Sequence, residues 1–352
     1  MTSHASAVAV TTTAPSTQAT SQPLPTPATL RNRLPLAPTL ASRIAQQRDA
    51  VRAILHGEDS RLLVIAGPCS LHDPAAALEY GERLAALAET LQDELLIVMR
   101  AYVEKPRTTV GWKGLLYDPH LDGSHDMATG LELSRRLLRE LAGLGLPLAT
   151  EILHPMAADY LDDLLSWAAI GARTTESQIH RERVSGLALP VGFKNSTDGS
   201  IGTAIDAMGA AAHSHCHLGM DSLGHPAMCV TAGNPDTHLV LRGGHGGPNC
   251  DAGSIASARA VLEGAGVNPR LVVDCSHANS GKNADRQPAV LHDLLAQRRA
   301  GQDAIAGVML ESHLVHGNQP LRGALTYGQS ITDACLGWDA TEALLREVAG
   351  HA

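Results

Sequence analysis

Short apolar runs alternate with longer amphipathic stretches along most of this chain. Eight such runs can be recognised, at residues 62–66, 95–100, 148–151, 168–172, 191–194, 238–242, 271–275 and 305–310. Continuous apolar runs of this kind are typical of parallel strands that are buried on both faces. The pattern therefore predicts eight parallel strands.

The stretches between most of these runs have the periodicity of helices. Residues 75–91, 130–144 and 256–266 place apolar side chains at i, i+3 and i+4, which is the spacing of one helical face. Strands that alternate with amphipathic helices form parallel βα units. Eight such units predict an α/β fold of the (β/α)8 TIM-barrel type rather than an open sheet.

Three segments depart from this rhythm. Residues 213–233 contain two short runs around a polar turn with glycine, which predicts an inserted β-hairpin, with a long irregular loop as the alternative. Residues 31–60 precede the first strand and predict an N-terminal arm with one helix at 40–55. Residues 1–30 are poor in large apolar side chains and predict a disordered tail, so we expect the catalytic barrel domain at 61–352.

Composition narrows the range of functions. Hydrophobic residues make up 44% of the 352 residues, which is enough for a large core, and the formal net charge is -9. A net acidic chain is a poor partner for nucleic acid or for an anionic membrane, so we expect neither. Any anion that the protein binds must therefore meet a local cluster of Lys and Arg.

Cysteine spacing and the absence of targeting signals indicate a cytoplasmic protein. The six cysteines lie far apart and form no CxxC pair, which argues against a disulfide scaffold. No apolar run approaches the roughly 18–20 residues of a membrane span, and no secretory signal is evident. A basic transit peptide is the alternative for the tail, although Arg31 is the first Arg or Lys of the chain.

Six basic side chains stand at or just after the carboxyl ends of predicted strands. They are Arg100, Lys105, Arg107, Arg173, Lys194 and Arg242. A barrel brings these strand ends to one face, where the catalytic groups of this fold lie. One such Arg could form a salt bridge at the rim, but six cations in an acidic protein would repel each other without a ligand. Because Arg matches phosphate and carboxylate with a fork of donors, the cluster predicts substrates with at least two anionic groups, most simply phosphates.

Side chains of the metal-ligand type fall at the same strand ends. Cys69 follows the first run, His277 the seventh and Glu311 the eighth, while Asp333 lies further along the chain. Taken singly, a buried Cys or a hydrogen-bonding His needs no metal. Together, a thiolate, an imidazole and two carboxylates fit one divalent metal such as Mn, Fe, Co or Zn. The scattered spacing differs from the short local pairs of structural zinc sites.

Several local strings are more specific than the barrel pattern. They are AGPCSLHDP at 66–74, KPRTTVGWKG at 105–114, IGARTTESQ at 170–178, GFKN at 192–195, LRGG at 241–244, DCSHANS at 274–280 and ITDAC at 331–335. In this order the strings resemble those of the type I 3-deoxy-D-arabino-heptulosonate 7-phosphate (DAHP) synthases, the microbial, feedback-regulated enzymes of the aromatic pathway. The resemblance runs from about residue 31 to the end of the chain and leaves only the tail outside.

This resemblance implies an activity and a set of ligands. The family condenses phosphoenolpyruvate with D-erythrose 4-phosphate and water to give DAHP and phosphate, the first step of the shikimate pathway to chorismate and the aromatic amino acids. The implied metal ligands are Cys69, His277, Glu311 and Asp333. The implied phosphoenolpyruvate contacts are Arg100, Lys105, Arg173, Lys194 and Arg242, and the implied erythrose 4-phosphate contacts are Arg107 and Thr108.

Three of these residues are expected to take part in the chemistry. Lys105 is the candidate general acid for the alkoxide that develops as the two substrates join, because it lies in the loop that carries both substrate contacts. Cys69 and His277 are expected to act through the metal. Glu151, at the end of the third run, is expected among the substrate contacts.

The resemblance also implies feedback by an aromatic amino acid, through the hairpin and the loop after the third strand, and here the chain departs from the family pattern. His154 and Pro155 stand where relatives commonly carry Asp and an apolar residue, and His217 replaces a frequent aromatic. Gly219 stands where phenylalanine-sensitive relatives carry Ser, which favours tyrosine. The change at His154 leaves any of the three aromatic amino acids, or none, open. A homodimer or homotetramer is expected, with the N-terminal arm as a candidate interface.

Two alternative functions stay open at this point. A related synthase would join phosphoenolpyruvate to another sugar phosphate, although the segment 105–108 argues against it. A non-catalytic barrel that binds an aromatic metabolite is the alternative from another class of protein. The complete set of candidate ligands and cations argues against that second alternative.

Overall fold

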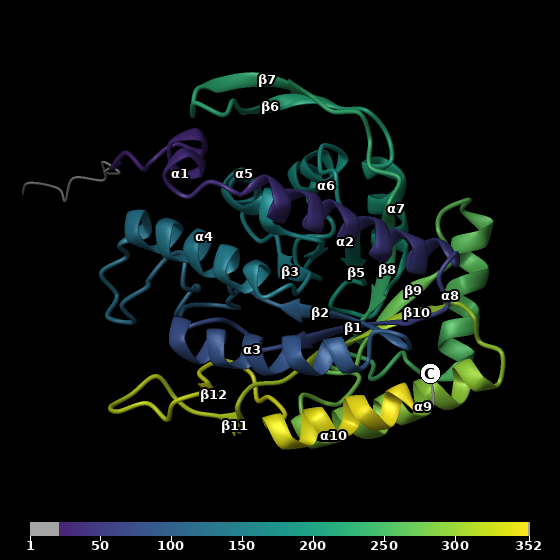
Figure 1. The fold of residues 1–352 in the computed structure, drawn as a ribbon. Helices are drawn as coiled ribbons and strands as arrows, with labels where there is room; N and C mark the ends of the chain where they lie inside the picture. Colours follow the sequence, from purple (N-terminus) through teal and green to yellow (C-terminus); the bar gives the residue numbers. More distant parts are fainter. Residues whose placement is uncertain (1–20, 351–352) are drawn as a thin grey trace, which may run out of the picture.

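Eight parallel strands close into a barrel in this computed structural model, which describes residues 21–350 (Figure 1). In chain order the strands are β1 (Leu62–Gly67), β2 (Leu95–Arg100), β3 (Leu148–Glu151), β4 (Trp167–Ile170), β5 (Val191–Lys194), β8 (Thr237–Leu241), β9 (Leu271–Asp274) and β10 (Ile305–Glu311). Each strand pairs in parallel with its neighbours around the barrel. The predicted TIM barrel is confirmed.

Helices pack around the outside of the strands. They are α3 (Pro74–Thr90), α4 (Met127–Gly143), α6 (Gln178–Ser185), α7 (Gly202–Ala211), α8 (Ala252–Gly264), α9 (Gln287–Arg299) and α10 (Trp338–Ala349). Carboxylates accept hydrogen bonds from free backbone N–H groups at several N-termini, with Asp73 on α3, Asp126 on α4 and Asp251 on α8. Across the described part of the chain, none of the helices combines the length and hydropathy of a membrane span.

Helix α2 (Pro38–His56) closes the amino-terminal end of the barrel. Its apolar face, with Val51 and Leu55, is buried against side chains that fill the barrel. Its polar face holds the segments that lead into the strands: Arg48 donates to the carbonyl of Leu165 before β4, and Arg52 forms an ion pair with Asp236 before β8. The amino-terminal end is therefore filled, which directs substrates to the carboxyl end of the strands.

The predicted hairpin is present and lies beside the N-terminal arm. Strands β6 (Cys216–Met220) and β7 (Pro226–Val230) pair antiparallel and extend away from the barrel (Figure 1). A short helix, α1 (Pro27–Arg33), reaches the hairpin turn, where the Ala28 N–H donates to the carbonyl of Ser222 at 2.9 Å.

Helix α1 begins at Pro27, before the expected boundary at residue 30. Thr26 caps helix α1 by accepting from the Thr29 N–H, and Leu30 is fully buried, so local capping and burial stabilise this helix. Of the tail expected at 1–30, residues 1–20 lie outside the described part of the chain.

Two short strands that the sequence pattern did not predict follow the last barrel strand. Strands β11 (Val315–Asn318) and β12 (Gln329–Ser330) pair in parallel and turn the chain back towards the barrel. The Leu336 N–H then donates to the carbonyl of Glu311 at 2.9 Å, at the end of β10. This return brings Asp333 beside Glu311, although 22 positions separate them in the sequence.

Candidate active site

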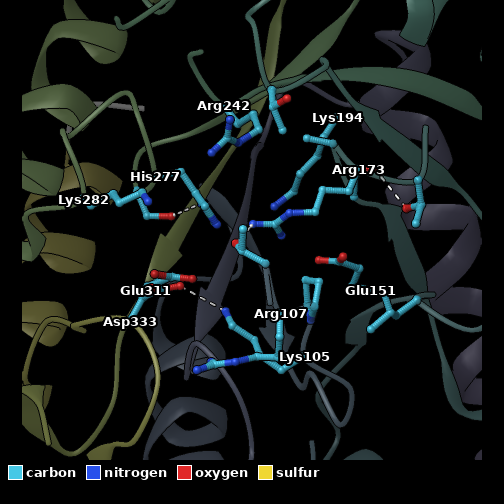
Figure 2. Close-up of a pocket in the computed structure, with 18 of the residues that line it drawn as sticks. Lys105, Arg107, Glu151, Arg173, Lys194, Arg242, His277, Lys282, Glu311 and Asp333 are labelled. Carbon is cyan, nitrogen blue, oxygen red and sulfur yellow. Dashed lines mark hydrogen bonds and ion pairs between the residues drawn. The ribbon is translucent and has the colours of Figure 1, made fainter. Parts of the chain in front are cut away.

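A cavity of about 310 Å³ opens at the carboxyl ends of the barrel strands (Figure 2). All six basic residues that the strand ends predicted lie in its wall, namely Arg100, Lys105, Arg107, Arg173, Lys194 and Arg242. The wall also contains Thr108, Glu151, His277, Glu311 and Asp333. Cys69 lies behind the wall, fully buried, and contacts it through Lys105. The structure thus brings every predicted site residue to one end of the barrel.

Three guanidinium groups in this cavity have no acidic partner. Within residues 21–350, no carboxylate forms an ion pair with Arg107, Arg173 or Arg242. Arg173 Nη2 instead donates to Thr108 Oγ1 at 3.1 Å, and Arg242 Nη1 donates to the carbonyl of Gly243 at 3.3 Å. Burial lowers the pKa of Arg242; the charges of Asp274 and Glu151 oppose this shift, and the charge of Arg173 adds to it. Arg107 and Arg173 are exposed and Arg242 is half-buried, so their unused N–H donors face the cavity and favour an anionic ligand.

Lys194 differs from the three arginines because its charge is already paired. Its Nζ lies 3.1 Å from Asp274 Oδ2, and both side chains are buried at the ends of β5 and β9. Burial opposes ionisation of Asp274, but His277 and Lys194 outweigh it and hold the pKa of that carboxyl well below its usual range. The ionised Asp274 carboxylate therefore holds the charged Lys194 ammonium in the cavity wall.

Arg100 anchors the backbone that carries the cysteine. The side chain is 1% exposed, donates to the carbonyls of Pro68 and Cys69, and lies 3.0 Å from Glu311 Oε1. Most of its donors are thus occupied by the protein itself. Its observed role is to hold Cys69 and Glu311 at fixed positions, and a direct contact with substrate stays a prediction.

Three of the four predicted metal ligands converge. One ligand atom each from Cys69, Glu311 and Asp333 lies within 4.8 Å of the others, which makes a group able to hold a metal ion. Asp333 Oδ2 lies 3.3 Å from Cys69 Sγ, and the Asp333 N–H also points at that sulfur. Burial raises the pKa of the Cys69 thiol to about 12 even with Lys105 beside it, so without a metal ion the sulfur keeps its proton at neutral pH. Cys69 and Glu311 are buried and Asp333 is exposed, and together their sulfur and two carboxylates fit a divalent transition metal.

The Lys105 ammonium occupies the edge of this group. Its Nζ lies 2.7 Å from Cys69 Sγ and 3.1 Å from Asp333 Oδ2. Burial penalises the ammonium, but the neighbouring sulfur and carboxylates outweigh that penalty and raise the pKa of Lys105. Lys105 is therefore protonated at neutral pH, as a proton donor must be.

His277, the fourth predicted ligand, lies on the same side of the cavity but outside the group of three (Figure 2). Its Nδ1 lies 2.9 Å from Asp274 Oδ2 and 2.8 Å from Ser276 Oγ, which leaves Nε2 as the free ring nitrogen. Histidine ligands commonly bind a carboxylate through the other nitrogen in this way. The residue has φ of 51°, so the backbone is held in the left-handed region to direct this side chain.

Glu151 has room in the cavity wall because a glycine, Gly171, directly follows the neighbouring strand β4. A Cβ at Gly171 would lie 2.3 Å from Glu151 Oε1, so any larger residue would displace the carboxylate. The carbonyl of Gly171 accepts hydrogen bonds from Thr174 and Thr175 N–H, which forms the turn that carries Arg173. This local geometry explains why the GAR segment follows β4.

Comparison with known proteins fits this geometry. The model of the DAHP synthetase I family matches residues 38–346. The chain belongs to this family. It is 53% identical over 330 residues to the Escherichia coli (strain K12) phospho-2-dehydro-3-deoxyheptonate aldolase called Tyr-sensitive, covering 93% of this chain and 92% of that one. The motif-based resemblance is thereby confirmed.

Two further relatives show the same relationship. The Phe-sensitive phospho-2-dehydro-3-deoxyheptonate aldolase of Escherichia coli (strain K12) is 53% identical over 325 residues, 92% of this chain and 93% of that one. Among solved structures, the phospho-2-dehydro-3-deoxyheptonate aldolase of Francisella tularensis SCHU S4 superimposes with a TM-score of 0.92 at 43% identity, covering 94% of this chain and 97% of that one. The family assignment thus covers the barrel and the whole cavity.

The sequence pattern did not predict three residues that lie in the cavity wall or directly behind it. Asp274 holds Lys194 and His277 from the end of β9, and its place in the DCSHANS string was the available signal. Lys282 lies in the cavity wall with φ of 61°, five residues after His277. Glu104 lies directly before Lys105 and is 2% exposed, and no spacing rule marks such a residue.

Proposed function

We propose that this chain condenses phosphoenolpyruvate with D-erythrose 4-phosphate and water to give DAHP and phosphate. The observation that carries the proposal is that one cavity holds two kinds of group. Arg107, Arg173 and Arg242 form no ion pair with a carboxylate of residues 21–350, and Cys69, Glu311 and Asp333 form a group able to hold a metal. Two phosphorylated substrates need such cations, and an aldehyde needs activation before carbon attacks it. The relatives from Escherichia coli and Francisella tularensis carry the corresponding aldolase name.

Phosphoenolpyruvate would bind between the strands that supply Arg173, Lys194 and Arg242. Strands β4, β5 and β8 are consecutive neighbours in the barrel, so these three positive charges face the same volume. They would hold the phosphate and offset the charge that it carries away as it leaves. Arg100 and Lys105 would approach the same substrate from the end of β2.

The erythrose 4-phosphate phosphate would bind Arg107 and Thr108. Arg107 lies beside Lys105, towards the end of the cavity away from Arg242 (Figure 2). Because Thr108 also accepts from Arg173, it connects the two proposed anion sites. The Glu151 carboxylate would accept a hydrogen bond from bound substrate or from the reacting water, since it faces the cavity from β3.

The reaction would join carbon 3 of phosphoenolpyruvate to the aldehyde carbon of erythrose 4-phosphate. The new alkoxide would take a proton from the Lys105 ammonium, and the water that adds at carbon 2 would return a proton to Lys105. The carbon–oxygen bond to phosphate would then break as the ketone forms, and the departing phosphate would take the remaining hydroxyl proton. Cys69, Glu311 and Asp333, with His277, would hold one divalent ion, of which Mn, Fe, Co and Zn are the candidates. When bound, such an ion supplies a Lewis acid for the aldehyde oxygen.

Regulation and assembly form a second part of this proposal. A cavity of about 370 Å³ lies between α6 and the hairpin, with Arg183, His217 and Cys229 in its wall. We propose that it accepts an aromatic amino acid, because the hairpin is where the family resemblance implies an effector. Gly219 favours tyrosine, while His154 leaves the choice among the three aromatic amino acids, or none, open. The assembly would be a homodimer or homotetramer.

A comparison of aldose substrates tests the proposed function. We expect kcat/KM for phosphate release to be at least about 100-fold higher with erythrose 4-phosphate than with arabinose 5-phosphate, because an extra hydroxymethylene unit shifts the second phosphate away from Arg107. Steady-state assays with phosphoenolpyruvate and manganese measure this ratio. Equal use of both aldoses, or a preference for arabinose 5-phosphate, would support the related synthase instead. No phosphate release with either aldose would support the non-catalytic barrel.

A further inference from the structure

Glu104 is a buried carboxylate that the proposed chemistry does not use. It is 2% exposed, and no Lys or Arg among residues 21–350 forms an ion pair with it. Its oxygens instead accept hydrogen bonds from the N–H of His154 at 3.3 and 3.4 Å, the N–H of Leu153 at 3.4 Å and the Tyr117 hydroxyl at 3.1 Å. A carboxylate buried without a cation is costly, which indicates a specific role for these contacts.

Glu104 stands at the base of the loop that carries the proposed substrate contacts. The Lys105 N–H donates to the carbonyl of Lys113 at 2.8 Å, and the Leu116 N–H donates to the carbonyl of Val103 at 3.2 Å, so segment 105–113 closes on itself. A Cβ at Gly114 would lie 2.3 Å from the Val103 oxygen, so the two ends of the loop pack closely. The backbone at the base of the loop therefore determines the direction in which the side chains of segment 105–113 point.

The partner of Glu104 is itself part of the cavity wall. Leu153 lines the cavity, and its carbonyl accepts from His180 Nε2 at 2.8 Å. Burial lowers the pKa of His180, so the ring is neutral, donates to Leu153 and accepts from Ser177 Oγ at 2.8 Å. The backbone of 153–154 is thus held by Glu104 through its N–H groups and by His180 through a carbonyl.

We propose that Glu104 is a positioning residue. Its carboxylate binds the N–H groups of Leu153 and His154 and thereby fixes the loop that begins at Lys105. From this loop Lys105 reaches the metal group, and Arg107 and Thr108 reach the second phosphate. Adjacent side chains make these two connections, since Glu104 contacts the loop after β3 while Lys105 contacts Cys69. The inference rests on the proposed function and deepens it by assigning a role to a residue that touches neither substrate nor metal.

This role gives the site a pH dependence with a defined sign. Burial raises the pKa of Glu104 to about 7, and the charge of Glu151 on β3 acts in the same direction, while Tyr117 and the N–H groups of Leu153 and His154 oppose it. Above that pH the carboxylate accepts from both N–H groups. Below it, one oxygen carries a proton and is a poorer acceptor, so the loop is held less firmly. Acidification through about pH 7 therefore raises KM for erythrose 4-phosphate and lowers kcat.

Glu104→Gln tests the proposal in the manganese-loaded enzyme. We expect KM for erythrose 4-phosphate to rise about tenfold and kcat to fall about tenfold. KM for phosphoenolpyruvate should change less than about twofold, because Lys105 alone among its proposed contacts lies on the loop that Glu104 holds. The differences in kcat and in KM for erythrose 4-phosphate between variant and wild type should become smaller as the pH falls from 8 to 6. Wild-type Glu104 becomes protonated over this range, whereas the amide of the variant does not titrate. Glu89→Gln, an exposed position on α3, is the matched control and should match wild type throughout.

A second variant keeps the test decisive if Glu104→Gln folds poorly. Tyr117→Phe removes one hydrogen bond that lowers the pKa of Glu104, so the acid limb of KM for erythrose 4-phosphate should shift to higher pH while the fold is retained. An active wild type, with folded variants that show wild-type KM, kcat and pH profiles, would overturn the positioning role and leave the proposed function intact. A wild type that releases no phosphate from phosphoenolpyruvate and erythrose 4-phosphate would overturn both.

Discussion

Cys69→Ala is expected to lower kcat about 1000-fold at every metal concentration. The sulfur is the one thiol of the candidate metal group, and it also contacts the Lys105 ammonium and the Asp333 N–H. Loss of a Lewis acid removes on the order of 4 kcal/mol of transition-state stabilisation, which is about a 1000-fold loss in kcat. Steady-state phosphate release at a series of manganese concentrations measures the loss.

Metal analysis after gel filtration separates this effect from misfolding. Wild type should retain about one manganese per chain and Cys69→Ala almost none, while circular dichroism shows an unchanged fold. Cys216→Ala, an exposed cysteine on the hairpin, is the matched control and should keep both metal and activity. Full activity of Cys69→Ala in the presence of excess chelator would refute the metal site.

Lys105→Met is expected to lower kcat by about 100-fold to 10000-fold, the usual range for loss of a general acid. Its effect on KM for phosphoenolpyruvate should be much smaller, because Arg173, Lys194 and Arg242 remain. The side chain also lies 2.7 Å from Cys69 Sγ, where its positive charge repels a bound cation. Removing it should therefore leave metal affinity unchanged or tighter, in contrast to Cys69→Ala. Steady-state kinetics together with a manganese titration measure both quantities.

Lys113→Met is the matched control for this charge removal. Lys113 closes the same loop, but its side chain is exposed and its hydrogen bond to the Lys105 N–H is made by the backbone carbonyl. The Lys113 ammonium lies 6.0 Å from the centroid of the Tyr117 ring, outside the cavity wall. Its kcat should stay within about twofold of wild type. A Lys105→Met enzyme with near-normal kcat would show that another group donates the proton.

The sequence was informative about the barrel because its strands are buried on both faces. Each of the eight apolar runs overlaps one barrel strand. The first residue of a strand differs from the first residue of its predicted run by at most one position, as at Trp167. The cations at the strand ends were predictable for a related reason: parallel strands in a barrel bring their carboxyl ends together whatever the loops do. Placement of Arg100, Lys194 and Arg242 follows from the strand pattern alone.

Other parts of the site depend on contacts between distant segments. Asp333 reaches Glu311 only because β11 and β12 turn the chain back, and two such short strands leave no clear pattern. Glu104 meets His154 across 50 positions, so its role depends on tertiary structure rather than on local spacing. The left-handed backbone at His277 is likewise invisible to periodicity. These tertiary contacts determine the orientation of the predicted side chains in the cavity.

The most direct test of the central claim is phosphate release from phosphoenolpyruvate by metal-stripped and manganese-loaded enzyme, with and without erythrose 4-phosphate. The account predicts release only when metal and both substrates are present, with one DAHP formed for each phosphate. Release without the aldose, or release that survives complete removal of the metal, would contradict it.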